Sequence, residues 1–529
     1  MGRSSSMMAI ANLTSRITGF VRQVALVAVL GVTTLSDAYT ISNTLPNIVY
    51  ELLIGGVLGS VLIPLLVRAQ AEDADGGVAY TRRLLTTAGA VLLLITALAL
   101  LAAPLLTGLY TGDASDPQTY DLALDLAYLL LPQIFFYGIG AIVGAVLNSK
   151  GAFGPFAWAP VLNNVVVLAM LGAYVFTPDE HRLLVLGLGT TLGIVAQTVV
   201  LLPSLRKAGF RYRPVWGWDP RLRTAGRLAG WSVLYAFVGF LGYLVTMRVA
   251  FASGEGAPTA YNNAWLLLQV PYGVLGVSLL TALMPRMSRA AAAGRYDDVV
   301  SDLSLGSRLA AVFLIPISAL ITAFGPEIGV ALFGLRSANL DGATTIGTAL
   351  AVSAFGLAPY AITLLQMRVF YAMTDSRTPT FVQLFTVGVK VALMLLCPVL
   401  LEPADVVLGL ATANALSFVA GALLGQVLLR RRLGRLPSRT ILGTGLRTLA
   451  AAVVGAAAAR GVLALLDLEP MLAVPALGRA WTAMFLALVL GGPLILLVMR
   501  VLRVRETEPL LRRIDGIVDR LRARRGPAR

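Results

Sequence analysis

Long apolar runs follow one another along nearly the whole of this 529-residue chain, and they restrict what it can fold into. Each run has the roughly 20 mainly apolar residues that a bilayer-crossing helix needs. Hydrophobic residues make up 57% of the chain, and only 13% of its residues are charged, about half the share in soluble proteins. We therefore expect an all-α polytopic membrane protein, because a helix satisfies its own backbone hydrogen bonds in lipid.

The spans alternate with loops of different charge. We count about fourteen candidate spans. They lie near residues 7–31, 36–69, 82–110, 122–148, 156–177, 182–205, 226–253, 258–288, 303–325, 341–372, 379–400, 405–430, 441–466 and 478–502. Loops after even-numbered spans are basic, whereas loops after odd-numbered spans are mostly acidic or neutral, so both termini are expected in the cytoplasm. This topology and contact with anionic lipids account for the net charge of +15 without a nucleic-acid partner.

The second and eighth spans share a sequence pattern. The second begins DAYTISN and the eighth begins TAYNNAW, so that Tyr39 matches Tyr261, 222 residues later. Further along, Tyr137 matches Tyr360 at a separation of 223. A repeat of six spans keeps its orientation in the membrane, so its axis lies along the membrane normal. We therefore expect two six-helix lobes related by a parallel pseudo-two-fold axis, followed by two C-terminal helices.

This repeat predicts the organisation of the chain. The expected parts are an N-terminal lobe at 1–205, a cytoplasmic amphipathic linker at 206–225, a C-terminal lobe at 226–431, a terminal helix pair at 432–503 and a basic amphipathic cytoplasmic tail at 504–529. The linker mixes arginines with Tyr212, Trp216 and Trp218, and the tail places apolar residues at helical spacing opposite arginines. Such basic amphipathic segments favour the inner membrane surface.

Charged side chains interrupt several spans, although they are costly there and usually face a cavity or each other. In the first span, Arg16 shares a polar and small-residue stripe with Asn12, Gly19 and Gln23, and Arg22 lies at its edge. The other charges in or at the ends of spans are Arg248, Arg368, Lys390, Asp37, Glu51 and Asp375. The cationic excess suits an anionic ligand, because the planar guanidinium of arginine matches phosphate or carboxylate oxygens.

Two of these cations have two interpretations each. Arg248 contacts the ligand, or it extends to the outer interface near Glu255. Lys390 contacts the ligand, or it is the partner of Glu51.

A third group lies at the cytoplasmic end of the tenth span. Arg368 and Arg377 with Asp375 either form a salt-bridge gate there or are ordinary topology charges.

The chain offers little for catalysis. It has a single cysteine, Cys397, and a single histidine, His181. A zinc site or a Ser/His triad inside the membrane needs more than these two residues supply. Neither a Walker loop nor a Rossmann glycine motif is present in the sequence. We therefore expect a protein that is not an enzyme and that has no catalytic residue, metal or cofactor.

Five motifs, in order along nearly the whole chain, resemble the MurJ (MviN) lipid II flippase family of the multidrug/oligosaccharidyl-lipid/polysaccharide exporter superfamily. They are SRITGFVRQ at 15–23, DAYTISNTLPN at 37–47, LNSKGAFGPFAWAPVLNN at 147–164, PYGVLGVSLLTALMPRMSR at 271–289 and RVFYAMTDSRTPT at 368–380. The resemblance implies fourteen helices around a central cationic cavity, with a groove for the lipid tail formed by the last two. It also implies the substrate, lipid II, which is an undecaprenyl-diphosphate-linked disaccharide-pentapeptide moved from the inner to the outer leaflet of the bacterial cytoplasmic membrane.

The resemblance also implies roles for single residues. Arg16, Arg22 and Asp37 match family residues held essential for transport, so we expect the arginines to hold the diphosphate and Asp37 to help gating. The expected substrate-binding residues are Arg16, Arg22, Arg248, Asn43 and Lys390. The expected gating or coupling residues are Asp37, Glu51, Asp375 and Arg368.

The chain departs from the family pattern in three places. Tyr50 and Glu51 stand where many relatives have an arginine, and the eighth span has none in its stretch YNNAWLLLQVP. We expect Arg248, one helix earlier, to supply the missing cation. The seventh span has no acid between Trp231 and Ser253, which argues against sodium coupling and favours the membrane potential as the driving force.

Other functions fit parts of the sequence. A flippase for another undecaprenyl-linked glycan would also be cationic and two-lobed, and only the motifs speak against it. A cation-coupled drug antiporter of the same superfamily would need a buried acid and a cavity suited to cations, so the cationic excess argues against it. A membrane scaffold that recruits wall-synthesis or division proteins through the basic tail would not need arginines inside the first span.

Overall fold

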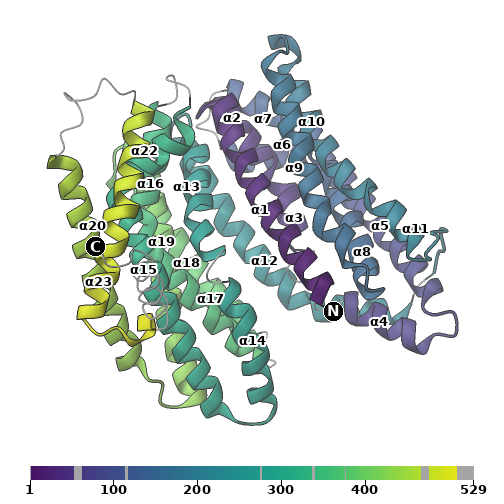
Figure 1. Ribbon diagram of the computed structural model, residues 1–529. Helices are drawn as coiled ribbons and strands as arrows, with labels where there is room; N and C mark the ends of the chain where they lie inside the picture. Colours follow the sequence, from purple (N-terminus) through teal and green to yellow (C-terminus); the bar gives the residue numbers. More distant parts are fainter. Residues whose placement is uncertain are drawn as a thin grey trace, which may run out of the picture. The chain divides into compact units, whose positions relative to one another are not determined.

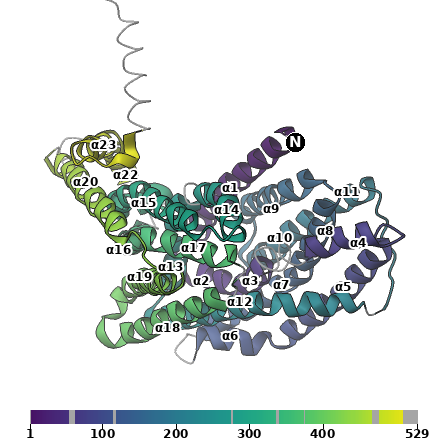
Figure 2. The same cartoon turned by 90° about the horizontal axis from the view of Figure 1, so that it is seen from below.

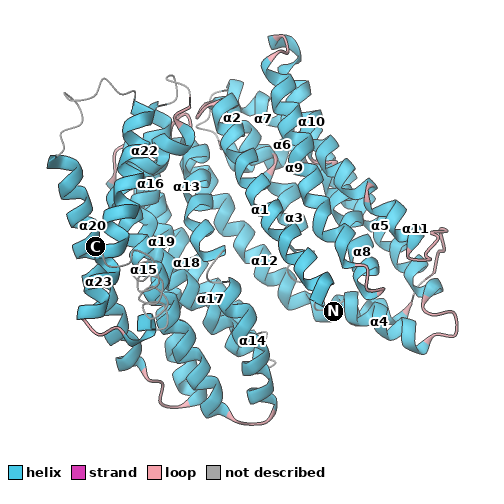
Figure 3. Cartoon of the chain, in the orientation of Figure 1, coloured by secondary structure: helices cyan, strands magenta, loops and turns pink. Residues whose placement is uncertain are grey.

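Helices form all the regular secondary structure in the part of the chain that the structure describes (Figure 3). The structure is a computed structural model, and it describes residues 2–52, 62–112, 117–217, 219–273, 277–335, 340–373, 375, 377–465 and 476–508. Within these ranges, 12 helices are long and apolar enough to cross a membrane. They match twelve of the predicted spans and confirm the all-α membrane fold. The other two predicted spans, 36–69 and 258–288, include residues outside the described ranges, so the count of fourteen stays a prediction.

The chain divides by its contacts into two compact units, Met1–Thr259 and Ala260–Arg529. The helices of the first unit are α1 (Gly2–Leu30), α2 (Thr34–Ser42), α3 (Thr44–Leu52), α4 (Ile63–Glu72), α5 (Val78–Leu101), α6 (Ala103–Thr111), α7 (Pro117–Leu130), α8 (Gln133–Ser149), α9 (Phe153–Val175), α10 (Asp179–Val199), α11 (Leu201–Lys207) and α12 (Pro220–Ser253). Helix α13 (Ala257–Pro271) begins at the end of this unit and continues into the second.

This division differs from the predicted lobes in one helix. Helix α12 was expected to open the C-terminal lobe, but it packs against α6 and α3 within the first unit. The predicted boundaries at 205 and 226 come from the sequence repeat rather than from contacts, and they stay a prediction.

In the first unit, α1 lies along α9, and α9 lies along α10 (Figure 1). The best-buried helix of the unit is α8, where 12 of 17 residues are buried. Glycines on α8 let its neighbours approach closely. A Cβ atom at Gly144, for example, would lie only 2.2 Å from the ring of Phe156 on α9. Helix α1, which carries the polar stripe, therefore packs against α9, and α9 in turn packs closely against α8.

Residues 208–217 of the predicted linker form a loop between α11 and α12. Phe210 is buried, and the Tyr212 hydroxyl lies 3.1 Å from Oγ1 of Thr86 on α5. The backbone N–H of Val215 donates to the same Thr86 oxygen at 3.1 Å. These contacts fix the loop to α5. Helix α12 begins at Pro220, inside the linker range predicted as 206–225.

The helices of the second unit are α14 (Val277–Ala292), α15 (Tyr296–Phe333), α16 (Leu340–Ser353), α17 (Leu357–Ala372), α18 (Arg377–Leu400), α19 (Val406–Leu433), α20 (Ser438–Leu465), α22 (Ala476–Leu486) and α23 (Gly492–Val501). Helix α15 packs against α14, α16, α17, α20 and α22 and organises this unit (Figure 2). Its backbone is non-helical at Phe324, two residues before Pro326, as expected for a proline-induced kink.

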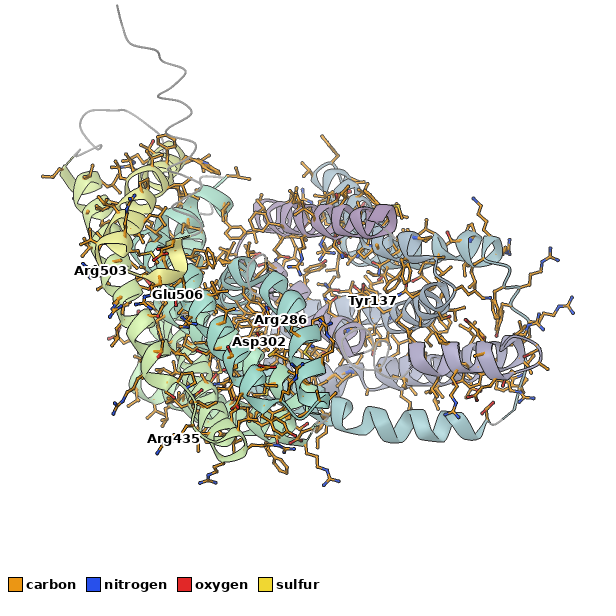
Figure 4. The ribbon with its side chains drawn as sticks, turned by 60° about the horizontal axis from the view of Figure 1, so that its bottom comes forward. Tyr137, Arg286, Asp302, Arg435, Arg503 and Glu506 are labelled. Carbon is orange, nitrogen blue, oxygen red and sulfur yellow. The ribbon has the colours of Figure 1, made fainter. Side chains whose placement is uncertain are left out.

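Ion pairs join α15 to its neighbours. Arg286 of α14 pairs with the buried Asp302 at 2.9 Å, and the two side chains lie together in Figure 4. Arg308 pairs with Glu506, which follows α23, and Glu327 pairs with Arg460 of α20. The terminal helix pair is therefore bound to α15 by two ion pairs as well as by apolar contacts. The predicted tail at 504–529 is described only as far as residue 508.

Candidate functional site

Helix α1 carries the two arginines that the sequence singles out, and α9 holds this helix in place. The side-chain amide of Asn164 on α9 donates to the carbonyl oxygen of Ser15 at 3.2 Å and to Oγ1 of Thr18 at 3.0 Å. These hydrogen bonds fix the turn that includes Arg16. Arg22 lies on the next turn.

Arg22 is half-buried, whereas Arg16 is exposed. The Nε of Arg22 is buried and has no hydrogen-bond partner in the described part of the chain. The charge of Arg22 acts on the hydroxyl of Tyr39, which lies 3.3 Å from Oγ1 of Thr190 on α10. A buried guanidinium donor needs an acceptor, and because the group is cationic, an anion compensates both the donor and the charge. The local geometry therefore favours an anionic ligand at Arg22.

Asp37 is among the most deeply buried carboxylates of the described chain, with 2% of its surface exposed. It accepts a hydrogen bond from the backbone N–H of Gly256 at 2.7 Å and another from that of Thr259 at 2.9 Å. Both donors belong to the N-terminus of α13, where the helix dipole favours a negative charge. Asp37 of α2 therefore acts as a cap for a helix far away in sequence.

The capping is reciprocal. Glu255, just before α13, accepts hydrogen bonds from the backbone N–H of Thr34 at 2.9 Å and from its hydroxyl at 3.0 Å, at the N-terminus of α2. The hydroxyls of Ser36 and Thr259 lie 3.0 Å apart between these caps. We call Thr34, Ser36, Asp37, Glu255, Gly256 and Thr259 the reciprocal cap. It joins the starts of the two helices that the sequence repeat matches.

Arg248 lies on α12 and is exposed. Its guanidinium lies beside Gly112, where a Cβ atom would come within 3.4 Å of Arg248 Nε. The carboxylate of Glu255, the alternative partner considered for Arg248, instead accepts hydrogen bonds from Thr34. The ligand role of Arg248 stays a prediction.

The remaining predicted residues of the first unit lie near the ends of α2 and α3. Asn43 is the C-cap residue that directly follows α2, and its Oδ1 is buried with no hydrogen-bond partner among the described groups. The side chain of Glu51 lies outside the described part of the structure, so its predicted role and its pairing with Lys390 stay predictions. Tyr50 lies against Tyr137, with ring centroids 4.5 Å apart and the rings tilted by 37°.

In the second unit, Lys390 is a half-buried residue of α18, and Arg368 is an exposed residue of α17. Arg368 lies close enough to Tyr272 and Tyr371 for its charge to act on both hydroxyls. No contact between Arg368 and Lys390 is seen in the described structure, and the binding role of each stays a prediction.

Asp375 caps the N-terminus of α18. Its carboxylate accepts hydrogen bonds from the backbone N–H groups of Arg377 and Thr378, each at 3.0 Å, and from the Thr378 hydroxyl at 2.7 Å. It also pairs with Arg432, at the end of α19, at 2.8 Å. Burial alone raises the pKa of Asp375, but these hydrogen bonds and the charge of Arg432 outweigh it and hold the pKa below its usual value. The sequence had suggested Arg368 and Arg377 as partners, and it missed Arg432.

Among the described residues, no group of three or more His, Cys, Asp or Glu side chains is arranged to hold a metal ion. The first unit therefore carries cations on α1 and hydrogen-bonded acids at the N-termini of α2 and α13, and the second unit carries one at the N-terminus of α18.

Comparison with known proteins decides the family. A family model described as lipid II flippase MurJ matches residues 26–474. The chain belongs to the MurJ family. This membership confirms the resemblance that the five motifs indicate. The matched range includes Asp37 but begins after Arg16 and Arg22, so the family match does not test the predicted roles of those arginines.

Individual MurJ relatives match over most of their length. A probable lipid II flippase MurJ of Rhizobium meliloti is 26% identical over 424 residues, which is 78% of each chain. A lipid II flippase MurJ of Burkholderia cenocepacia is 27% identical over 378 residues, covering 69% of this chain and 72% of the relative.

Solved structures support the same fold. The chain is similar to a lipid II flippase MurJ in an inward closed conformation, with a TM-score of 0.76, 18% identity and coverage of 94% of this chain and 98% of that one. An inward-facing multidrug resistance MATE transporter of the MOP superfamily has a TM-score of 0.66 and 14% identity, with coverage of 80% and 98%. At these identities the likeness concerns the fold alone.

Proposed function

We propose that this chain is a lipid II flippase, which moves the undecaprenyl-diphosphate-linked peptidoglycan precursor from the inner to the outer leaflet. Membership of the MurJ family supports this function. The structural observation that carries it is Arg22, whose half-buried guanidinium keeps an unpartnered Nε donor among the described residues. A diphosphate supplies the oxygen acceptors and the negative charge that such a group needs.

The diphosphate binds Arg16 and Arg22 together, and Arg248 and Asn43 are further ligands in the same unit. Lys390, in the second unit, is a separate proposed contact to the substrate. Moving a diphosphate through hydrocarbon without counter-charges is prohibitively costly, because an ion loses its hydration there. Two fixed guanidinium groups replace part of that hydration, and α1 is held in place by Asn164. The site thereby lowers the barrier for the polar headgroup, while the prenyl chain stays in lipid or in a groove of the terminal helices.

Transport proceeds by alternating access between two lobes, and the reciprocal cap is a gate in this cycle. Its carboxylates compensate the N-terminal dipoles of α2 and α13, so separating these helix ends exposes both. Opening then requires water or substrate to replace the lost hydrogen bonds. Asp375, Arg368 and Glu51 have gating or coupling roles elsewhere in the cycle.

The membrane potential drives the cycle. Each elementary charge moved through the potential is worth about 2.3 kcal/mol per 100 mV. The stretch between Trp231 and Ser253 has no acid for a sodium site, so we propose no coupling ion and no cofactor. As a transporter, the chain does not act as an enzyme.

The chain is a multi-pass protein of the bacterial cytoplasmic membrane, and we propose that both termini lie in the cytoplasm. The basic loops contact anionic lipids of the inner leaflet. Proteins of wall synthesis or division are the expected protein partners.

The second candidate is a flippase for another undecaprenyl-linked glycan, since the arginines would bind any diphosphate. A cation-coupled drug antiporter fits less well, because its ligand would be repelled by Arg16 and Arg22. To separate these functions, the full chain is reconstituted in proteoliposomes with fluorescent lipid II, with an undecaprenyl-linked teichoic-acid precursor, or with a cationic dye. The proposal predicts protein-dependent translocation of lipid II under an imposed membrane potential. Translocation of the teichoic-acid precursor or the dye, without lipid II, would contradict it.

A further inference from the structure

Four aromatic rings pack on one another in the second unit. Trp265 comes from α13, Tyr272 directly follows that helix, Tyr360 comes from α17 and Phe418 from α19. Trp265 stacks on Phe418 with centroids 5.5 Å apart and an interplanar angle of 21°, and Tyr360 lies 4.8 Å from Phe418. Tyr272 meets Tyr360 edge to face at 4.9 Å. We call these four residues the aromatic platform.

The platform is not ordinary core packing. All four side chains are half-buried and keep exposed surface. The core rings of the same unit differ, since Phe324, Phe333 and Phe370 are at most 1% exposed. A cluster of four rings that remain partly open forms a surface that can receive a further flat, partly apolar group.

The depth of the platform indicates what its open side faces. Phe418 lies halfway along the span Pro403–Leu433. Tyrosine and tryptophan normally lie at the membrane interfaces, where their polar atoms meet water. At mid-depth those atoms would be unsatisfied against lipid, so an open tyrosine or tryptophan there favours a water-containing, polar cavity. The exposed Arg368, whose charge acts on the Tyr272 hydroxyl, points to the same environment.

The sequence repeat places a similar pair in the first unit. Tyr50 and Tyr137 match Tyr272 and Tyr360 at separations of 222 and 223 residues. Their centroids are 4.5 Å apart, and the Tyr137 hydroxyl donates to Oδ1 of Asn47 at 3.0 Å. A tyrosine pair therefore recurs at matched positions of both repeats, although the surrounding sequences differ.

We propose that the aromatic platform binds a sugar ring of the transported lipid headgroup. A pyranose ring has an apolar face of C–H groups and a rim of hydroxyl groups. The C–H face stacks on the electron-rich faces of Trp265 and Tyr272, and the rim meets the tyrosine hydroxyls and Arg368. A prenyl chain would have no use for these polar groups. This inference rests on the proposed function, which supplies a disaccharide headgroup.

The test uses the full-length protein in nanodiscs and two soluble probes. One is farnesyl diphosphate linked to the disaccharide-pentapeptide, and the other is farnesyl diphosphate alone. Calorimetry measures the affinity of each probe for the wild type, Trp265→Leu, Tyr272→Leu and Tyr272→Phe. Phe240→Leu is the matched control, because Phe240 pairs with Tyr110 at 6.3 Å in the first unit, outside the platform.

The platform predicts that Trp265→Leu and Tyr272→Leu each bind the sugar-bearing probe about fivefold to tenfold more weakly. Both variants bind farnesyl diphosphate like the wild type, and Phe240→Leu binds both probes normally. Tyr272→Phe keeps the ring but loses the hydroxyl, so it binds the sugar-bearing probe more weakly than the wild type and less weakly than Tyr272→Leu, with farnesyl diphosphate unaffected.

The sugar-binding role of the platform would be overturned if Trp265→Leu and Tyr272→Leu lost affinity equally for the two probes. It would also be overturned if neither variant lost affinity for the sugar-bearing probe. A wild type that binds both probes equally well would overturn it too. A wild type that binds neither would instead overturn the proposed function.

Discussion

The carboxylate of Asp37 accepts a hydrogen bond from the backbone N–H of Thr259, the residue 222 positions later that the internal repeat matches to it. A neighbouring hydrogen bond runs in the opposite sense, from Thr34 to Glu255. Each helix start thus supplies the acid that caps the other. The Asp37 half of this contact is strengthened by its burial, yet the whole contact contains few atoms and can break in one step.

Replacing Asp37 by asparagine should weaken the reciprocal cap. The variant keeps the shape of the side chain but loses the charge and one acceptor oxygen, so we expect a local loss of about 1–2 kcal/mol. Hydrogen–deuterium exchange at the amides of Gly256 and Thr259 should then be about tenfold faster. Asp75→Asn is the matched control, because Asp75 caps an exposed turn through the N–H groups of Gly77 and Ala79. Unchanged exchange in Asp37→Asn would show that Asp37 does not hold the helix starts together.

Replacing Arg22 by lysine should impair binding although the charge is retained. Lysine lacks the planar fork and the Nε donor that is unpartnered in the described structure. We expect the affinity for farnesyl diphosphate to fall at least tenfold, as for the loss of a charged hydrogen bond. Arg68→Lys is the control, because Arg68 is exposed and pairs with Glu72 four residues later. Equal affinities of wild type and Arg22→Lys would exclude a bidentate role for this guanidinium.

Replacing Gly329 by alanine should destabilise the second unit. A Cβ atom there would lie 2.1 Å from the carbonyl oxygen of Ala343, so α15 and α16 would have to separate. We expect a loss of about 3 kcal/mol or more and a lower melting temperature in detergent. Gly461→Ala on α20 is the matched helical control, since its Cβ would meet nothing within 4 Å. That change should be neutral or slightly stabilising. A Gly329→Ala variant that melts like the wild type would contradict the close contact of α15 and α16.

The cap at Asp375 should contribute more stability than its ion pair. Asp375→Ala removes the cap of α18 and should cost about 1 kcal/mol. Arg432→Ala should cost less, because the Arg432 side chain is 49% exposed and its pair is screened by solvent. Because the pKa of Asp375 is lowered in the folded state, its contribution is present above its ordinary pKa and is lost as pH falls through the folded value. Thermal melts of both variants at pH 7 and in acid check the order and the sign. A larger loss of stability in Arg432→Ala than in Asp375→Ala would contradict the dominance of the helix cap over the ion pair.

The sequence predicted the described helices well, because spans are long and their apolar character is unmistakable. It also identified the arginines of α1, since charges inside a span stand out. It matched Tyr137 to Tyr360, and each of these rings contacts a second tyrosine. It did not find the donors to Asp37, the partner of Glu255 or the pairing of Asp375 with Arg432. These contacts join helix ends and loops far apart in sequence, where no periodicity marks which polar groups meet.

The central claim is that Arg16 and Arg22 hold the diphosphate of lipid II. The most direct measurement is the amount of lipid II exposed on the outer leaflet of a bacterium whose own flippase is switched off and replaced by this chain. Wild type, Arg16→Ala, Arg22→Ala and the control Arg182→Ala, all at equal expression, are compared. The account predicts exposure with the wild type and Arg182→Ala, and its loss with each α1 variant. Normal exposure with Arg16→Ala and Arg22→Ala, or none with the inserted wild type in its native host, would contradict it.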